Sequence, residues 1–121
     1  MTQSPKQVDH NKIGGMNIGG RTVLTPESSI TYENCSEIEK KIEDAIQLSN
    51  TEIILDCKHV GFLDSAGLEL LVQTHADLQS KGSVLKIVGL NEVCRDIMLV
   101  TRILHVLFVY KDIHEAITKQ S

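Results

Sequence analysis

Residues 51–72 read TEIILDCKHVGFLDSAGLELLV and combine two apolar runs with a polar joint. The first run, residues 51–57, is β-prone with few polar breaks, which is typical of a strand covered on both faces in a largely parallel sheet. In the second run, apolar residues from Leu68 onward recur at helical spacing and predict a helix that ends near Gly82. The stretch therefore predicts a buried strand, a turn and a helix in succession.

The joint between the two runs holds two residues that can each begin a helix. Asp64 and Ser65 both accept hydrogen bonds from free backbone N–H groups at N-cap positions, and only one of them can occupy the cap. If Asp64 is the cap, Ser65 enters the first turn with a hydroxyl that the backbone does not need. A helix N-terminus tolerates an added phosphate, because its dipole and free N–H groups favour negative charge. Ser65 is therefore either a capping residue or a phosphorylation site.

The rest of the chain continues an alternation of helices and strands. Before the quoted stretch we expect a short or distorted strand in residues 12–21 and a strand in 21–25 that stops at Pro26. A helix should follow from Asn34, with Ile38, Ile42, Ala45 and Ile46 on one face. After the stretch we expect a strand in 83–89, a third helix marked by Val93, Ile97, Val100 and Leu104, a strand in 106–110 and a closing helix in 111–117. Such alternation implies right-handed crossovers and an α/β fold with a largely parallel sheet.

Composition limits the classes of function. A chain of 121 residues is one domain by length, and its net charge of -4 and aromatic content of 3% are unfavourable for binding nucleic acid. The odd number of cysteines, at Cys35, Cys57 and Cys94, fits reduced thiols in the core. Cys57 and His59 form a single close pair, too few ligands for a metal site.

The N-terminal segment does not have the pattern of a signal peptide. Residues 1–12 are polar and predict a flexible tail, and they lack the apolar segment of a signal peptide. No stretch approaches the roughly 20 apolar residues of a membrane span. We therefore expect a cytoplasmic protein without membrane insertion.

Ser65 has a second chemical interpretation, as a nucleophile. The G-x-S-x-G elbow requires a glycine two residues before the serine, and Leu63 stands there instead. His75, His105 and His114 follow Ser65, but the sequence pairs none of them with an acid. We therefore expect no catalytic residues and no enzyme activity, and we interpret His75 as a half-buried packing residue.

Residues 52–90, EIILDCKHVGFLDSAGLELLVQTHADLQSKGSVLKIVGL, closely resemble the signature region of STAS domains, the fold of bacterial anti-sigma factor antagonists. Members carry an apolar strand ending in Leu-Asp, a short loop and then Asp-Ser-(Ser/Ala/Gly)-Gly-Leu. The resemblance continues through VCRDIMLVTRILHVLFVYKDIHEAI, residues 93–117, and covers residues 30–118 in all. It implies a single STAS domain over residues 13–121, with a small mixed sheet of about four to five strands, about four surrounding helices and an N-terminal hairpin.

The resemblance also implies a function. In antagonists that cycle through phosphorylation, an ATP-binding, histidine-kinase-like anti-sigma factor phosphorylates the serine of this motif, and a metal-dependent phosphatase reverses the reaction; here that serine is Ser65. The unmodified protein would bind the anti-sigma factor and free the sigma factor, and the phosphoprotein would release its partner. The implied partner-binding residues are Phe62, Asp64, Ser65, Ala66, Gly67, Leu68 and Glu69, with Val60 as a further candidate. No cofactor is implied.

Some features depart from the family pattern or leave alternatives open. In SSITYEN, residues 28–34, Ser28 and Thr31 replace the glycine and aspartate of the family's Gly-x-Leu/Ile-Asp, so the resemblance does not extend to the partner contacts of this loop. The glycine-rich start predicts a shortened or irregular hairpin. Similar motifs occur in STAS subunits that regulate ABC-type lipid transport ATPases, which is the alternative function. The sequence does not decide the oligomeric state, a homodimer included.

Overall fold

The structure is a computed structural model that describes residues 13–48 and 52–119. Its elements are β1 (Ile13–Ile18), β2 (Arg21–Pro26), α1 (Cys35–Gln47), β3 (Glu52–Asp56), α2 (Ser65–Ser80), β4 (Val84–Val88), α3 (Glu92–Val100), β5 (Phe108–Tyr110) and α4 (Ile113–Thr118). The strands form one sheet in the order β1-β2-β3-β4-β5, antiparallel between β1 and β2 and parallel elsewhere. The predicted α/β architecture with a mixed sheet is confirmed. The predicted tail, residues 1–12, lies outside the described residues.

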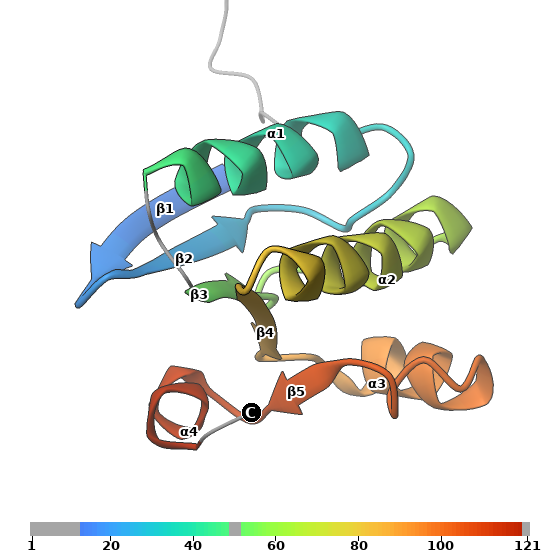
Figure 1. The fold of residues 1–121 in the computed structure, drawn as a ribbon. Coiled ribbons are helices and arrows are strands. Elements are labelled where there is room, and N and C mark those ends of the chain that lie inside the picture. The colour runs from blue at the N-terminus through green and yellow to red at the C-terminus, as the bar shows by residue number, and fades with distance from the viewer. Residues whose placement is uncertain (1–12, 49–51, 120–121) are drawn as a thin grey trace, which may run out of the picture.

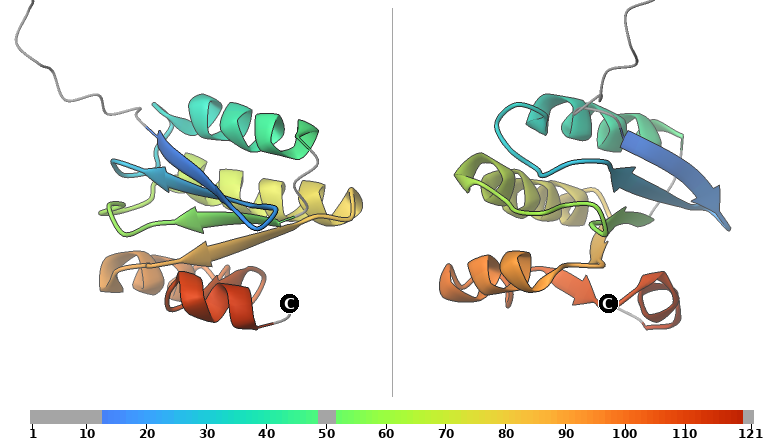
Figure 2. Two further views of the ribbon diagram at one scale, coloured as in Figure 1. Left: turned by 90° about the vertical axis from the view of Figure 1, so that its left-hand side faces the viewer. Right: turned by 180° about the vertical axis from the view of Figure 1, so that it is seen from behind.

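The helices divide between the two faces of the sheet. α1, α2 and α3 cover one face and α4 covers the other (Figures 1 and 2). The larger core lies under the three helices, where Ile53, Leu55 and Ile87 are fully buried. The smaller core, under α4, consists of Val23, Ile54, Val88 and Ala116. Because β3 and β4 are covered on both faces, they are largely apolar in the sequence, with the buried Lys86 as the exception in β4.

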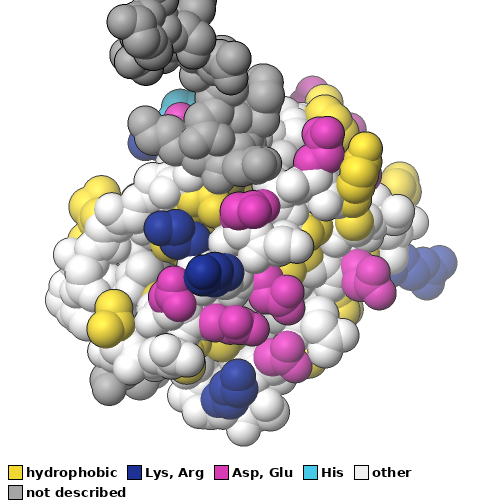
Figure 3. All heavy atoms as spheres, turned by 90° about the horizontal axis from the view of Figure 1, so that it is seen from above, with side chains coloured by type: hydrophobic (Ala, Val, Ile, Leu, Met, Phe, Trp, Pro, Cys, Tyr) yellow, Lys and Arg dark blue, Asp and Glu magenta, His cyan; other side chains and the backbone are white. Residues whose placement is uncertain are grey.

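The outer face of α1 is charged. Viewed from above the molecule, acidic side chains and fewer basic ones are interspersed on this surface (Figure 3). The exposed charged residues of α1 are Glu37, Glu39, Lys40, Lys41, Glu43 and Asp44, whereas Ile38, Ile42 and Ala45 are buried. This is the amphipathic pattern that the sequence predicts.

The N-terminal hairpin is regular, so the prediction of a distorted first strand is wrong. Pairing runs without interruption from Ile13 opposite Pro26 to Ile18 opposite Arg21. Gly19 and Gly20 form the turn with φ values of 56° and 82°, as a two-residue hairpin turn requires. Two of the glycines therefore make the turn rather than disturb the strand, which removes the reason to expect a distorted strand.

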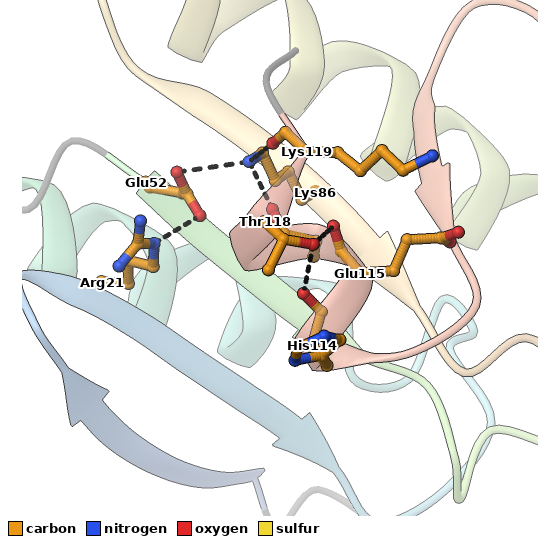
Figure 4. A network of polar contacts seen from close by, with 8 residues as sticks. Arg21, Glu52, Lys86, His114, Glu115, Thr118 and Lys119 are labelled. Atoms are coloured by element: carbon orange, nitrogen blue, oxygen red, sulfur yellow. Dashed lines mark hydrogen bonds and ion pairs between the residues drawn. The ribbon is translucent and has the colours of Figure 1, made fainter.

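A buried lysine joins the sheet to α4 (Figure 4). The Lys86 Nζ atom donates hydrogen bonds to the carbonyl oxygens of Ala116, at 2.6 Å, and Lys119, at 3.1 Å. It also lies 3.4 Å from the Glu52 carboxylate, which pairs with Arg21 at 2.9 Å. An ammonium group at the carbonyl end of a helix is electrostatically favourable. Lys86 therefore helps to hold the C-terminal end of α4 on the sheet.

The core-facing side of α3 contains only part of the predicted apolar stripe, because Ile97 packs partly buried against the core but Val93 and Val100 do not. Cys94 and Met98 are fully buried, whereas Val93 is 52% exposed and Val100 is 79% exposed. The Asn91 side chain caps the helix by accepting a hydrogen bond from the Cys94 N–H at 2.7 Å. Apolar residues cover more than half of the circumference of this short helix, so spacing alone cannot select its inner face.

α3 also ends earlier than predicted. Arg102 has a left-handed φ of 65°, and the Ile103 N–H donates to the Met98 carbonyl at 2.9 Å, which closes the helix in a Schellman motif. Leu104 therefore lies beyond the helix. The next strand begins at Phe108, two residues later than the apolar run suggests.

Over the described ranges, no helix has the length and apolarity needed to cross a membrane.

Candidate functional site

Ser65 is the first residue of α2, and Asp64 is its cap. The Asp64 side chain accepts a hydrogen bond from the Gly67 N–H at 2.8 Å. Ser65 is exposed, and its hydroxyl has no hydrogen-bond partner within residues 13–48 and 52–119. The condition stated from the sequence is therefore met: Asp64 caps the helix, and the Ser65 hydroxyl is not needed by the backbone.

The Asp64 carboxylate also holds a second segment of the chain. It accepts a hydrogen bond from the backbone N–H of Tyr32 at 3.0 Å, in the loop between β2 and α1. The bonds from Gly67 and Tyr32 lower the pKa of the Asp64 carboxyl, because both stabilise its charged form. One carboxylate thus joins the start of α2 to the loop before α1.

The two loops lie side by side over several residues. Ile30 forms a parallel bridge with Leu63, and the Ile30 N–H donates to the Phe62 carbonyl at 3.3 Å. The Ser29 hydroxyl accepts a hydrogen bond from the Phe62 N–H at 3.1 Å. These contacts fix the backbone directly before Asp64.

Gly67 marks the closest approach between α2 and this neighbouring loop. A Cβ atom added at Gly67 would overlap the Ile30 carbonyl oxygen and lie 3.1 Å from the carbonyl carbon. Ile30 itself is fully buried. The glycine of the Asp-Ser-Ala-Gly motif is therefore needed for packing.

The segment that departs from the family pattern satisfies its own polar groups. The Asn34 side chain is buried, accepts from the Thr31 N–H at 2.9 Å and donates to the Ser29 carbonyl at 2.9 Å. The Thr31 hydroxyl accepts from the Glu33 N–H at 3.2 Å. Thr31 therefore builds the turn. Sequence reasoning missed the roles of Asn34 and the exposed Tyr32. An asparagine before a helix indicates a side-chain cap, but the Asn34 side chain does not cap α1, so this signal would not have revealed its contacts within the loop.

An open groove of about 670 Å³ begins at Ser65. It lies along α2 and is closed on one side by Ile103, after α3; its lining residues are Ser65, Ala66, Leu68, Glu69, Val72, Gln73 and Ile103. Four of the predicted partner-binding residues thus share one surface. An open groove of this kind suits a protein surface better than an enclosed small molecule.

The remaining predicted site residues are placed differently. Phe62 is 49% exposed in the loop before α2, and Glu69 is exposed on α2. Gly67 and Leu68 are both buried, and Leu68 lines the groove. Val60 is 1% exposed, so its prediction as a surface residue is wrong. It packs in the core, because the turn after β3 points its side chain inward.

The other chemically active side chains do not join this site. His75 is 8% exposed and contacts the Phe108 ring edge-on, with 5.3 Å between the ring centroids. Within the described residues, the His75 Nδ1 atom has no hydrogen-bond partner. Burial raises the pKa of the Cys57 thiol, so it stays protonated. Across the described parts of the chain, no group of three or more His, Cys, Asp or Glu residues is arranged to hold a metal ion.

Comparisons with known proteins agree with the observed fold. A family model described as STAS domain matches residues 10–116. Comparison with curated proteins found no match. One similar structure is a candidate anti-sigma factor antagonist from Thermotoga maritima, with a TM-score of 0.81 and 22% identity over 89% of this chain and 93% of that one. A second is an anti-sigma factor antagonist from Mycobacterium paratuberculosis, with a TM-score of 0.78 and 21% identity over 88% of this chain and 91% of that one. A third is SpoIIAA, an anti-sigma factor antagonist in its unphosphorylated form, with a TM-score of 0.72 and 18% identity over 88% of this chain and 93% of that one. These likenesses show the fold, and the family match covers most of the sequence. The chain therefore belongs to the STAS domain family.

Proposed function

We propose that this protein is an anti-sigma factor antagonist whose binding is switched by phosphorylation of Ser65. The observation that carries the proposal is the exposed Ser65 hydroxyl, which lacks a partner at a helix start already capped by Asp64. A kinase can therefore modify it without breaking a hydrogen bond of the fold. SpoIIAA has the same fold, and its structure is that of an unphosphorylated form. This supports phosphorylation as a switch in a STAS domain.

The position of Ser65 gives a physical reason for a switch. A phosphoserine adds a charge of about -1.5 to -2. The start of α2 accommodates this charge, because its N–H groups and dipole favour anions. A partner that packs against Ser65 and the exposed Glu69 would meet that charge beside the Asp64 carboxylate. Like-charge crowding and desolvation would then weaken the complex.

In this proposal the protein acts by binding and not by catalysis. A nucleophilic serine is activated by an adjacent base. His75 instead packs against Phe108, and the Ser65 hydroxyl contacts no histidine within the described residues. The proposed partners are a histidine-kinase-like anti-sigma factor and a metal-dependent phosphatase. Because such a kinase uses intracellular ATP, we place this action in the cytoplasm.

The test uses the purified protein with each kinase-type anti-sigma factor of its source organism. We expect one of them, with ATP, to add one phosphate to the wild-type protein and none to Ser65→Ala. Ser36→Ala is the matched control, because Ser36 is also an exposed serine in the first turn of a helix, and it should accept phosphate normally. Ser65→Ala should bind the kinase more tightly than Ser65→Asp.

Two results would contradict the proposal. Equal binding of Ser65→Ala and Ser65→Asp would show that charge at Ser65 does not control the partner. Stable co-purification with a transport ATPase, without phosphorylation by any of the kinases, would instead favour the role as a transporter subunit.

A further inference from the structure

We infer that Tyr32 and Phe62 are the aromatic anchors by which this protein selects its kinase-type partner; this inference rests on the proposed function. Tyr32 is 75% exposed and Phe62 is 49% exposed. The chain contains only two tyrosines and two phenylalanines. The other two, Phe108 and Tyr110, are half-buried and contact His75 and Lys86 respectively, so both well-exposed aromatic side chains lie in the two loops beside Ser65.

The two loops hold the backbone of Tyr32 and of Phe62 in place before any partner arrives. The Tyr32 N–H is bonded to the Asp64 carboxylate at 3.0 Å. Both backbone groups of Phe62 are bonded, its N–H to the Ser29 hydroxyl and its carbonyl to the Ile30 N–H. An aromatic side chain on a fixed backbone has few rotatable bonds to immobilise, so binding costs less conformational entropy. Exposed rings of this kind serve as interface anchors rather than as core residues.

The surroundings of the anchors indicate the kind of partner. Glu33 beside Tyr32 and Glu69 on α2 are exposed acids, and the groove between Ser65 and Ile103 is open. The complementary surface is a protein face with apolar pockets for two rings and basic residues around them. Because Asp64 directly precedes Ser65 and also accepts the Tyr32 N–H, the backbone that carries the anchor is joined to the start of the helix that carries Ser65. The aromatic pair selects the partner, and Ser65 sets the state of the complex.

The test measures the dissociation constant of the kinase complex for single variants. Tyr32→Ala and Phe62→Ala should each weaken binding by about tenfold or more, as expected for anchor residues. Tyr32→Phe should retain near wild-type affinity, because it keeps the ring. Leu48→Ala is the matched control: Leu48 is also 75% exposed, but it lies at the opposite end of α1, and its loss should leave the affinity unchanged.

Asp64→Asn tests the connection between the anchor and the helix start. An asparagine can still cap α2, but its amide nitrogen cannot accept the Tyr32 N–H while its oxygen accepts the Gly67 N–H. We expect weaker binding, and the loss in the double variant with Tyr32→Ala should be smaller than the sum of the two single losses. Circular dichroism of each variant confirms that it is folded.

The outcomes separate this inference from the proposed function. If the wild-type protein binds the kinase and is phosphorylated at Ser65, but Tyr32→Ala binds as tightly as Leu48→Ala, the anchor role is refuted and the switch stands. If no kinase binds or modifies the wild-type protein, the proposed function fails and the inference fails with it.

Discussion

Replacing Gly67 with alanine tests the contact that positions the candidate site. Alanine is favoured over glycine within a helix by about 1 kcal/mol, so helix propensity alone predicts stabilisation. The structure predicts the opposite, because the new methyl group would overlap the Ile30 carbonyl oxygen. That atom belongs to the backbone, so it cannot rotate away as the end of a flexible side chain could.

The cost follows from what must move. Overpacking of a buried contact costs about 1–3 kcal/mol. Shifting the Ile30 segment also strains its hydrogen bonds to Phe62 and Asp64, each worth about 0.5–1.5 kcal/mol. After the gain of about 1 kcal/mol in helix propensity is subtracted, we expect Gly67→Ala to lower the free energy of unfolding by about 1–5 kcal/mol.

Urea unfolding followed by far-ultraviolet circular dichroism measures this change, and the m-value should stay constant. Gly61→Ala is the matched control in the preceding loop. Its added Cβ would lie 3.4 Å from the Ser29 hydroxyl oxygen, a tolerable contact at an exposed position. We expect the control to stay within about 1 kcal/mol of wild type. A Gly67→Ala protein as stable as wild type would show that the close approach to Ile30 does not exist in solution.

Three further predictions concern other parts of the fold. Lys86→Met should lower the free energy of unfolding by about 2–4 kcal/mol in urea titrations, because the carbonyl groups at the end of α4 lose their donor; an unchanged midpoint would contradict this. Arg102→Gly should raise Tm by about 2–5 °C in calorimetry, because glycine adopts the left-handed φ of 65° without strain, and a lower Tm would count against that explanation. The lowered pKa of Asp64 contributes stability that is present above its ordinary value of 3.8 and is lost as the pH falls through the lower, folded-state pKa. Asp64→Asn should therefore unfold with a weaker pH dependence below about pH 4 than wild type, and identical acid titrations would refute the assignment.

The parts of the fold that short-range chemistry controls were predictable from the sequence. The run at β3 is apolar because the strand is covered on both faces, and Asp64 is a good cap whatever lies around it. Gly82, with φ of 78°, ends α2 as a helix-terminating glycine should. In each case the residue type and its immediate neighbours carry the information.

The inner face of α3 could not be predicted in this way. Val93, Cys94, Ile97 and Met98 offer two overlapping apolar stripes, and the helix must choose between them. The choice depends on Asn91, whose side-chain nitrogen donates to the Gly61 carbonyl at 3.1 Å and so fixes where the helix starts. That contact joins residues 30 positions apart. Sequence spacing within the helix does not contain it.

The role of Tyr32 could not be predicted for the same reason, because it depends on a contact between residues far apart in the sequence. That contact also explains why the motif has aspartate at position 64. Serine or asparagine would cap α2 about as well as aspartate does. Aspartate adds a second acceptor oxygen, and here that oxygen holds the Tyr32 N–H, which lies 32 positions away in the sequence. A serine at position 64 could not make both bonds at once. Asp64 therefore caps α2 and holds the Tyr32 segment without any contribution from Ser65, and this leaves the Ser65 hydroxyl available for chemistry that the fold itself does not require.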